Sequence, residues 1–169
     1  MNYFEFFAIP VSFQVDEAQL KRIFYANSKK YHPDFYTLES AEKQEEILEL
    51  STLNNKAYKT LKDFDARLKY ILEWKGILKE EGQHKVPQDF LMEMMDINEA
   101  LMDLKMDPNE EQLAKTRAQV ENLEKELMDG ILPILSSYTG DKEQEEDLKK
   151  VLDFYLKRRY LLRIRQDLN

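Results

Sequence analysis

Apolar residues recur at steps of three and four along most of this chain, which is the spacing of one face of an α-helix. The first set covers residues 20–31 behind an N-capping Asp16 and predicts an amphipathic helix of about four turns. The second covers residues 47–61 and places the polar Asn54 on its apolar stripe. Two such helices, joined by a short irregular stretch, are expected to pack as an antiparallel hairpin.

Short helices are predicted on both sides of this hairpin. Residues 2–7 form an aromatic segment that Pro10 should terminate, and its expected role is to cover the hairpin. After the hairpin, residues 67–74 form a compact apolar helix. The pattern then fails over residues 76–86, a glycine-containing and highly charged stretch that is typical of a linker.

Three further amphipathic helices follow the linker. They are predicted at residues 87–106, 113–135 and 148–162, with Gly130 and Pro133 expected to bend or break the second. Helices with connections this short make an antiparallel three-helix bundle. The fold class is therefore all-α, with a first domain over residues 1–75, a linker over 76–86 and a bundle over 87–169.

Composition supports this fold class and narrows the function. Only 4 glycines and 5 prolines in 169 residues argue against a turn-rich sheet protein, and the lack of cysteine removes disulfides and thiolate metal ligands. No apolar run suggests a membrane span or a secretory signal. The net charge of −8 comes mainly from residues 76–169, with 14 basic and 21 acidic residues. Nucleic acid is therefore not an expected partner, and the basic stretch 157–165 is interpreted as a solvated helix face.

A single tripeptide, His32-Pro33-Asp34, separates the two helices of the predicted hairpin. Proline lacks a backbone donor and disfavours the helical conformation of the preceding residue, so the first helix should stop at Tyr31. Two interpretations of the bare tripeptide are open: an ordinary helix end at which Asp34 caps a turn, or a rigid recognition loop. The preceding helix carries four basic residues that cannot all share its apolar stripe, and a positive surface steers a negatively charged partner. These residues are Lys21, Arg22, Lys29 and Lys30.

The order of these features resembles a J domain over residues 1–75: an aromatic segment, a basic helix, the tripeptide, and a longer helix that contains residues 53–61. The resemblance implies that the tripeptide and the basic helix dock on a DnaK-type chaperone and stimulate its ATP hydrolysis. The implied chaperone-binding residues are His32, Pro33, Asp34, Lys21, Arg22, Lys29 and Lys30. Asp34 is the candidate for a charge-assisted contact, because a carboxylate on a rigid loop can accept a bidentate arginine.

A J-like segment followed directly by a helical bundle is similar to the HscB family, the co-chaperones of iron–sulfur cluster assembly. In that family the first bundle helix binds the cluster scaffold protein, of the IscU type, and residues 89–101 match that helix. The chaperone served would be HscA-like. By position, the resemblance implies scaffold contacts at Leu91, Met92, Met95, Asp96, Glu99, Asp103 and, from the third helix, Tyr155, with Phe154 as its alternative.

The residues themselves make such a contact surface plausible. Six of the eight residues 90–97 are apolar, which is more than one core-facing stripe needs, so some are expected to face outward. Methionine suits an adaptable binding surface, and an exposed apolar patch rimmed by carboxylates is typical of an interaction site. The alternative is that all six pack inside the bundle or against the first domain.

Catalysis is not expected of this chain. It has no cysteine nucleophile and no glycine-rich phosphate loop, and its only other histidine, His84, lies in the polar linker and is expected at the surface. We therefore expect no resident cofactor or metal, and a regulator of a partner's ATPase rather than an enzyme. A general J-domain co-chaperone for unfolded or misfolded clients is the alternative function. A bacterial cytoplasm is the expected location, ahead of the mitochondrial matrix.

Overall fold

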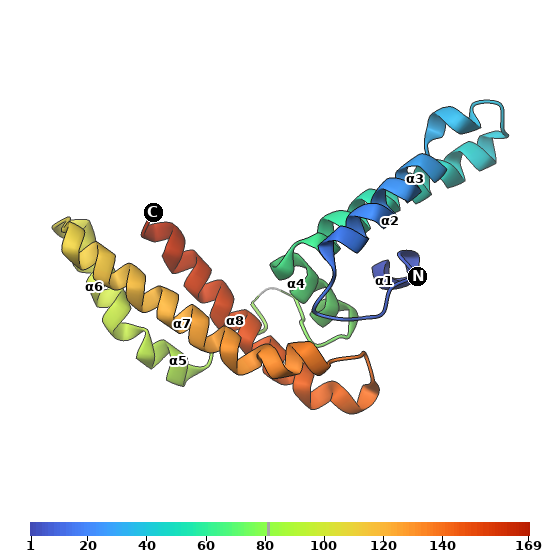
Figure 1. The fold of residues 1–169 in the computed structure, drawn as a ribbon. Coiled ribbons are helices and arrows are strands. Elements are labelled where there is room, and N and C mark those ends of the chain that lie inside the picture. Colours follow the sequence, from blue (N-terminus) through green and yellow to red (C-terminus); the bar gives the residue numbers. More distant parts are fainter. Residues whose placement is uncertain (81) are drawn as a thin grey trace. The chain divides into compact units, whose positions relative to one another are not determined.

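The computed structural model describes residues 1–80 and 82–169, and every regular element within those ranges is helical (Figure 1). The elements, in chain order, are α1 Tyr3–Phe6, α2 Glu17–Lys30, the 3-10 turn η1 Pro33–Tyr36, α3 Ala41–Lys62, α4 Phe64–Trp74, α5 Gln88–Glu93, α6 Met95–Met106, α7 Glu110–Ser137, the 3-10 turn η2 Lys142–Gln144 and α8 Glu145–Asp167. The all-α prediction is confirmed. None of the described helices has the length and apolar content needed to cross a bilayer.

The chain forms two compact units. Unit 1 comprises Met1–Ile71 together with Tyr138–Gly140, and unit 2 comprises Leu72–Ser137 and Asp141–Asn169. The functional division predicted from the sequence, at residues 75 and 86, stays a prediction.

Unit 1 is built on the hairpin of α2 and α3, which lie side by side in Figure 1. Helix α2 begins where predicted, because the Asp16 carboxylate accepts hydrogen bonds from the backbone N–H groups of Ala18 (2.9 Å) and Gln19 (3.2 Å). The short α1 ends at Phe6, before Pro10, and Ala8, two residues later, adopts a left-handed φ of 54°. The buried apolar core of this unit consists of Phe4, Phe7, Phe13, Leu20, Ile47, Ala57, Leu61, Leu68, Ile71 and Tyr138.

One buried amide links the two helices of the hairpin. Asn54 is almost completely buried, and its Nδ2 donates to the Phe24 carbonyl (3.1 Å) and to Ser28 Oγ (3.2 Å). Its Oδ1 accepts from Asn27 Nδ2 at 3.2 Å. Both amide donors and the acceptor are therefore satisfied across α2 and α3, which explains how a polar residue occupies the apolar stripe.

Unit 2 has α7 and α8 side by side, with α6 along α7 and α5 next to α6 (Figure 1). The prediction of one helix over residues 87–106 is wrong, because the helix is interrupted at Met94, whose ψ of −7° departs from helical geometry. The Met94 N–H still bonds the Phe90 carbonyl and the Met94 carbonyl still accepts from Asn98, so α5 and α6 remain joined. The core of this end of the unit consists of Phe90, Met94, Ile97, Val120, Leu161, Ile164 and Leu168.

Helix α7 runs unbroken through Gly130 and Pro133, so the predicted break does not occur. The proline removes the hydrogen bond to the carbonyl of Asp129. Both Pro133 and Asp129 are exposed, so water can satisfy that carbonyl. Ile131 and Leu135 are buried on the opposite side of this turn, and their packing holds the helix together.

Candidate functional site

Two surfaces carry the residues singled out by sequence: the loop after α2 in unit 1 and the outer face of α5 and α6 in unit 2. In the loop, α2 ends at Lys30, and His32 is extended with a ψ of 122°, as expected of a residue before proline. Pro33 opens the η1 turn, and His32 rather than Asp34 caps it, because His32 Nδ1 accepts the Asp34 N–H at 3.2 Å. In this geometry a neutral His32 carries its proton on Nε2.

The cap leaves the Asp34 carboxylate available for another molecule. Its side chain is 85% exposed and lies 3.7 Å from His32 Nδ1. Among the described residues, no donor forms a hydrogen bond with this carboxylate. The interpretation of the tripeptide as an ordinary helix end capped by Asp34 is therefore not supported. The geometry favours an acidic group that faces solvent.

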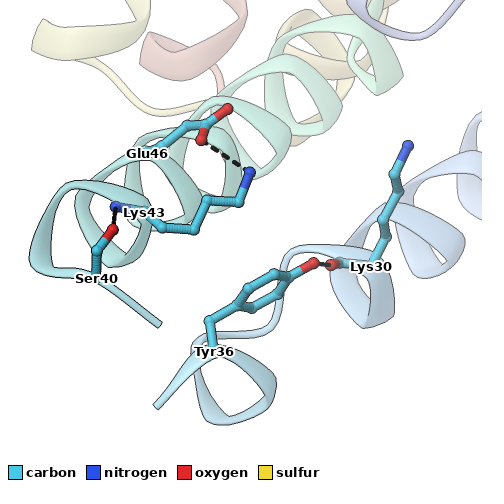
Figure 2. Close-up of polar contacts among 5 residues, drawn as sticks. All are labelled: Lys30, Tyr36, Ser40, Lys43 and Glu46. Carbon is cyan, nitrogen blue, oxygen red and sulfur yellow. Dashed lines mark hydrogen bonds and ion pairs between the residues drawn. The ribbon is translucent and has the colours of Figure 1, made fainter. Parts of the chain in front are cut away.

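Polar contacts fix both ends of the loop (Figure 2). On one side, the Tyr36 hydroxyl donates to the Lys30 carbonyl at 2.6 Å, which closes η1 onto the end of α2. On the other, Ser40 Oγ accepts the Lys43 N–H at 3.2 Å and caps α3. Lys43 Nζ also lies 2.9 Å from Glu46 Oε2, and this hydrogen bond raises the pKa of Lys43.

The four basic residues of α2 all lie at the surface. Lys21 and Arg22 are exposed in the first half of the helix, and Lys29 and Lys30 are exposed in its last turn, next to the tripeptide. Cations in the last turn also complement the helix dipole. The expectation that these side chains face solvent is confirmed, whereas their contact with a chaperone stays a prediction.

The outer face of α5 and α6 is apolar with an acidic rim. Leu91, Met92 and Met95 are 40%, 64% and 57% exposed, and we call these three residues the methionine face. The other three apolar residues of this segment, Phe90, Met94 and Ile97, are buried, so the six divide evenly between core and surface. The rim consists of three exposed carboxylates, Asp96, Glu99 and Asp103.

The aromatic residue expected from the third helix does not join this face. Tyr155 and Phe154 are both buried in α8, and the guanidinium of Arg159 lies 5.5 Å from the Tyr155 ring. The expectation of an accessible Tyr155 is therefore corrected. Tertiary packing buries both rings. The α8 ring that meets α5 and α6 belongs to Tyr160, which lies edge-on to Phe90 with 5.6 Å between ring centroids and whose hydroxyl accepts from Asn98 Nδ2 at 2.9 Å.

Sequence reasoning missed four exposed apolar side chains beside these two surfaces. Met102 and Met106 are exposed on α6, and Phe35 and Leu38 are exposed directly after the tripeptide. The sequence carried a signal for the two methionines, because both fall outside the apolar stripe of their helix.

The described residues contain no group of three or more His, Asp or Glu side chains placed to hold a metal ion. His84 is half-buried, and its Nε2 accepts the Lys79 N–H at 2.9 Å in an exposed part of the linker, which is a structural role.

Comparison with known proteins covers both units. Residues 86–169 match the family model described as the HSCB C-terminal oligomerisation domain. A co-chaperone protein HscB homolog from Haemophilus ducreyi is 35% identical over 143 residues, which are 83% of each chain. The co-chaperone protein HscB of Buchnera aphidicola subsp. Acyrthosiphon pisum is 33% identical over 172 residues, covering 93% of this chain and 98% of that one.

Solved structures agree with this comparison. The crystal structure of human co-chaperone protein HscB superposes with a TM-score of 0.76 at 27% identity and covers 99% of this chain and 80% of the human one. The chaperone HscB from Vibrio cholerae shares the fold, with a TM-score of 0.68 at 24% identity over 98% of this chain and 96% of that one.

Proposed function

This chain belongs to the HscB co-chaperone family, and from that premise we propose that it is a two-ended adaptor in iron–sulfur cluster assembly. Unit 2 would bind a cluster scaffold protein of the IscU type. The loop and basic helix of unit 1 would engage a DnaK-type, HscA-like chaperone and stimulate its ATPase. The bacterial origin of the curated relatives supports a bacterial cytoplasm as the setting.

The observation that carries the chaperone half is the exposed Asp34 carboxylate on a loop fixed at both ends. A fixed carboxylate loses little conformational entropy when an arginine binds it, and charge-assisted bonds to a guanidinium are among the stronger polar contacts. Lys29 and Lys30 lie in the last turn of the preceding helix and would speed association with an acidic surface of the same chaperone.

The scaffold half rests on the methionine face and its acidic rim. An exposed apolar patch gains free energy when a partner removes it from water, and methionine adapts to different partner shapes. The three rim carboxylates favour a scaffold surface that carries lysine or arginine around an apolar centre. Tyr155 stays outside the proposed contact surface because it is buried.

The chaperone half is tested by a steady-state ATPase titration of an HscA-like chaperone. Asp34→Asn and His32→Gln should each abolish most of the stimulation, because the first removes the charge and the second removes the imidazole that caps η1. Asp34 and His32 are both exposed, so circular dichroism should show unchanged folding. Stimulation equal to that of the parent chain would exclude the proposed chaperone contact.

The scaffold half is tested by calorimetric titration with a purified scaffold protein. Leu91→Ala combined with Met95→Ala should weaken binding by about 10- to 100-fold, the range expected when central apolar contacts are truncated. Leu132→Ala is the matched control, because Leu132 is 43% exposed on α7, close to the 40% of Leu91. Unchanged affinity in the folded double variant would remove the methionine face from the proposal.

A general co-chaperone for unfolded clients remains the second candidate, favoured by the adaptability of exposed methionines. The two functions separate in a competition experiment. A chain dedicated to the scaffold should bind it in preference to an unfolded model protein, and saturating scaffold should block whatever binding the unfolded protein shows. Equal affinity for both would favour the general co-chaperone.

A further inference from the structure

Two apolar side chains beside Asp34 face solvent. Phe35 is 74% exposed, and Leu38 is fully exposed. We propose that Phe35 and Leu38 form an apolar anchor that packs against the same chaperone that Asp34 contacts and sets the affinity of docking. This inference rests on the proposed function, because it assigns further contact residues to the proposed chaperone surface.

The exposure of the anchor is not the result of a loose loop. The Phe35 N–H bonds the His32 carbonyl at 3.1 Å, and the Glu39 N–H bonds the Tyr36 carbonyl at 3.1 Å. The Tyr36 hydroxyl bonds the Lys30 carbonyl, as Figure 2 shows, so the neighbouring aromatic ring is turned back toward α2. The backbone is thus held in a form that leaves Phe35 outside.

The segment after η1 is held in the same way. The side-chain amide of Gln44 donates from α3 to the carbonyls of Thr37 (3.3 Å) and Glu39 (3.0 Å), the two residues that flank Leu38. Leu38 therefore projects from a fixed backbone. Large apolar side chains on pre-organised backbone lose little entropy on binding, which is what interface anchors require.

The position of Phe35 links the anchor to the proposed chaperone contact. The Phe35 ring packs edge-on against His32, with 5.7 Å between ring centroids. The Asp34 carboxylate and the Phe35 ring both border the His32 imidazole. An arginine bonded to Asp34 would lie about 2.8 Å from its carboxylate, so the surface that supplies this arginine would also reach the Phe35 ring. Covering this ring would exclude water from the Asp34 contact and strengthen it.

The test is an ATPase titration with the full chain, in which both the half-maximal concentration and the maximal rate are measured. Phe35→Ala should raise the half-maximal concentration about tenfold or more, as expected for a buried aromatic contact, and Leu38→Ala about threefold. Phe35→Leu should recover most of the affinity, because it restores apolar bulk. Leu132→Ala, an exposed leucine of unit 2, should leave the titration unchanged.

Salt separates the anchor from the charged contacts. Burial of apolar surface is not screened by salt, whereas the contacts of Asp34 and the basic residues are. Phe35→Ala should therefore shift the whole titration while leaving its salt dependence unchanged. A flattened salt dependence in Phe35→Ala would show that the variant disturbed Asp34 instead, and would overturn the anchor.

The outcome for the anchor is distinguishable from that for the proposed function. If Asp34→Asn abolishes stimulation but Phe35→Ala and Leu38→Ala leave the half-maximal concentration unchanged, the anchor is wrong and the proposed function stands. If Asp34→Asn has no effect, both fail. The alternative is that the anchor binds a second copy of this chain, and sedimentation velocity tests it. A dimer that Phe35→Ala dissociates, with no change in the ATPase titration, would overturn the inference.

Discussion

Removing the buried amide of Asn54 should destabilise the hairpin that displays the tripeptide. Asn54→Ala deletes three hydrogen bonds between α2 and α3. Each bond contributes about 1 kcal/mol net, which sets an upper value of about 3 kcal/mol. Two of the three partners are not orphaned, because Ser28 Oγ also donates to the Phe24 carbonyl at 2.8 Å. The expected loss is therefore about 2 kcal/mol of the free energy of opening.

Hydrogen exchange measured by mass spectrometry reports this loss helix by helix. Under conditions where exchange follows the opening equilibrium, 2 kcal/mol corresponds to roughly 30-fold faster exchange of the protected amides of α2 and α3. Peptides from α7 and α8 serve as an internal reference, because Asn54 makes its hydrogen bonds within unit 1. A global melting temperature is less informative, since a chain of two units need not unfold in one step.

The matched control is Asn55→Ala, the adjacent residue on the same helix, which is exposed. It should change exchange in α2 and α3 by less than about 0.5 kcal/mol, as surface substitutions usually do. Two results would refute the reasoning: a similarly small change in Asn54→Ala, or equal acceleration in both units. The first would mean that water replaces the lost bonds, and the second that the amide stabilises more than the hairpin.

Three further predictions concern other parts of the chain. Burial raises the pKa of Tyr70, whose hydroxyl oxygen accepts the Tyr3 N–H at 3.0 Å, so the unfolded chain loses this proton at a lower pH than the folded one. The stability of unit 1 should therefore fall as pH rises above about 10, and Tyr70→Phe should weaken that fall in alkaline denaturation curves. Arg117→Met removes the guanidinium that donates to the Leu168 carbonyl at the end of α8, and should accelerate exchange in the last turn of α8 about tenfold, with α2 unchanged. Glu99→Lys should weaken scaffold binding mainly below about 0.1 M salt, where surface charges are least screened; a salt-independent loss in calorimetric titration would contradict this.

Some features of this protein follow from local sequence alone. Helical periodicity and the scarcity of glycine determined the all-α class, and Asp16 determined where α2 begins, because a capping carboxylate acts within its own turn. Pro33 determined the end of α2, since it restricts the residue before it. Periodicity also placed Asn54 on the buried stripe, although the three bonds that make its burial tolerable involve residues of the other helix.

Only the tertiary structure decided which face of each helix is covered. Met92, Met94 and Met95 are chemically alike, yet only Met94 is buried, because it alone faces the core that α7 and α8 complete. Long-range packing likewise kept α7 intact through Pro133, against the local preference of proline. It also buried Tyr155, which the family resemblance had placed on a contact surface. Local interactions fix which residues share a helix face. Whether that face is buried depends on which other element packs against it. The sequence therefore determined the helices, and the assembled units decided which of their residues remain available to a partner.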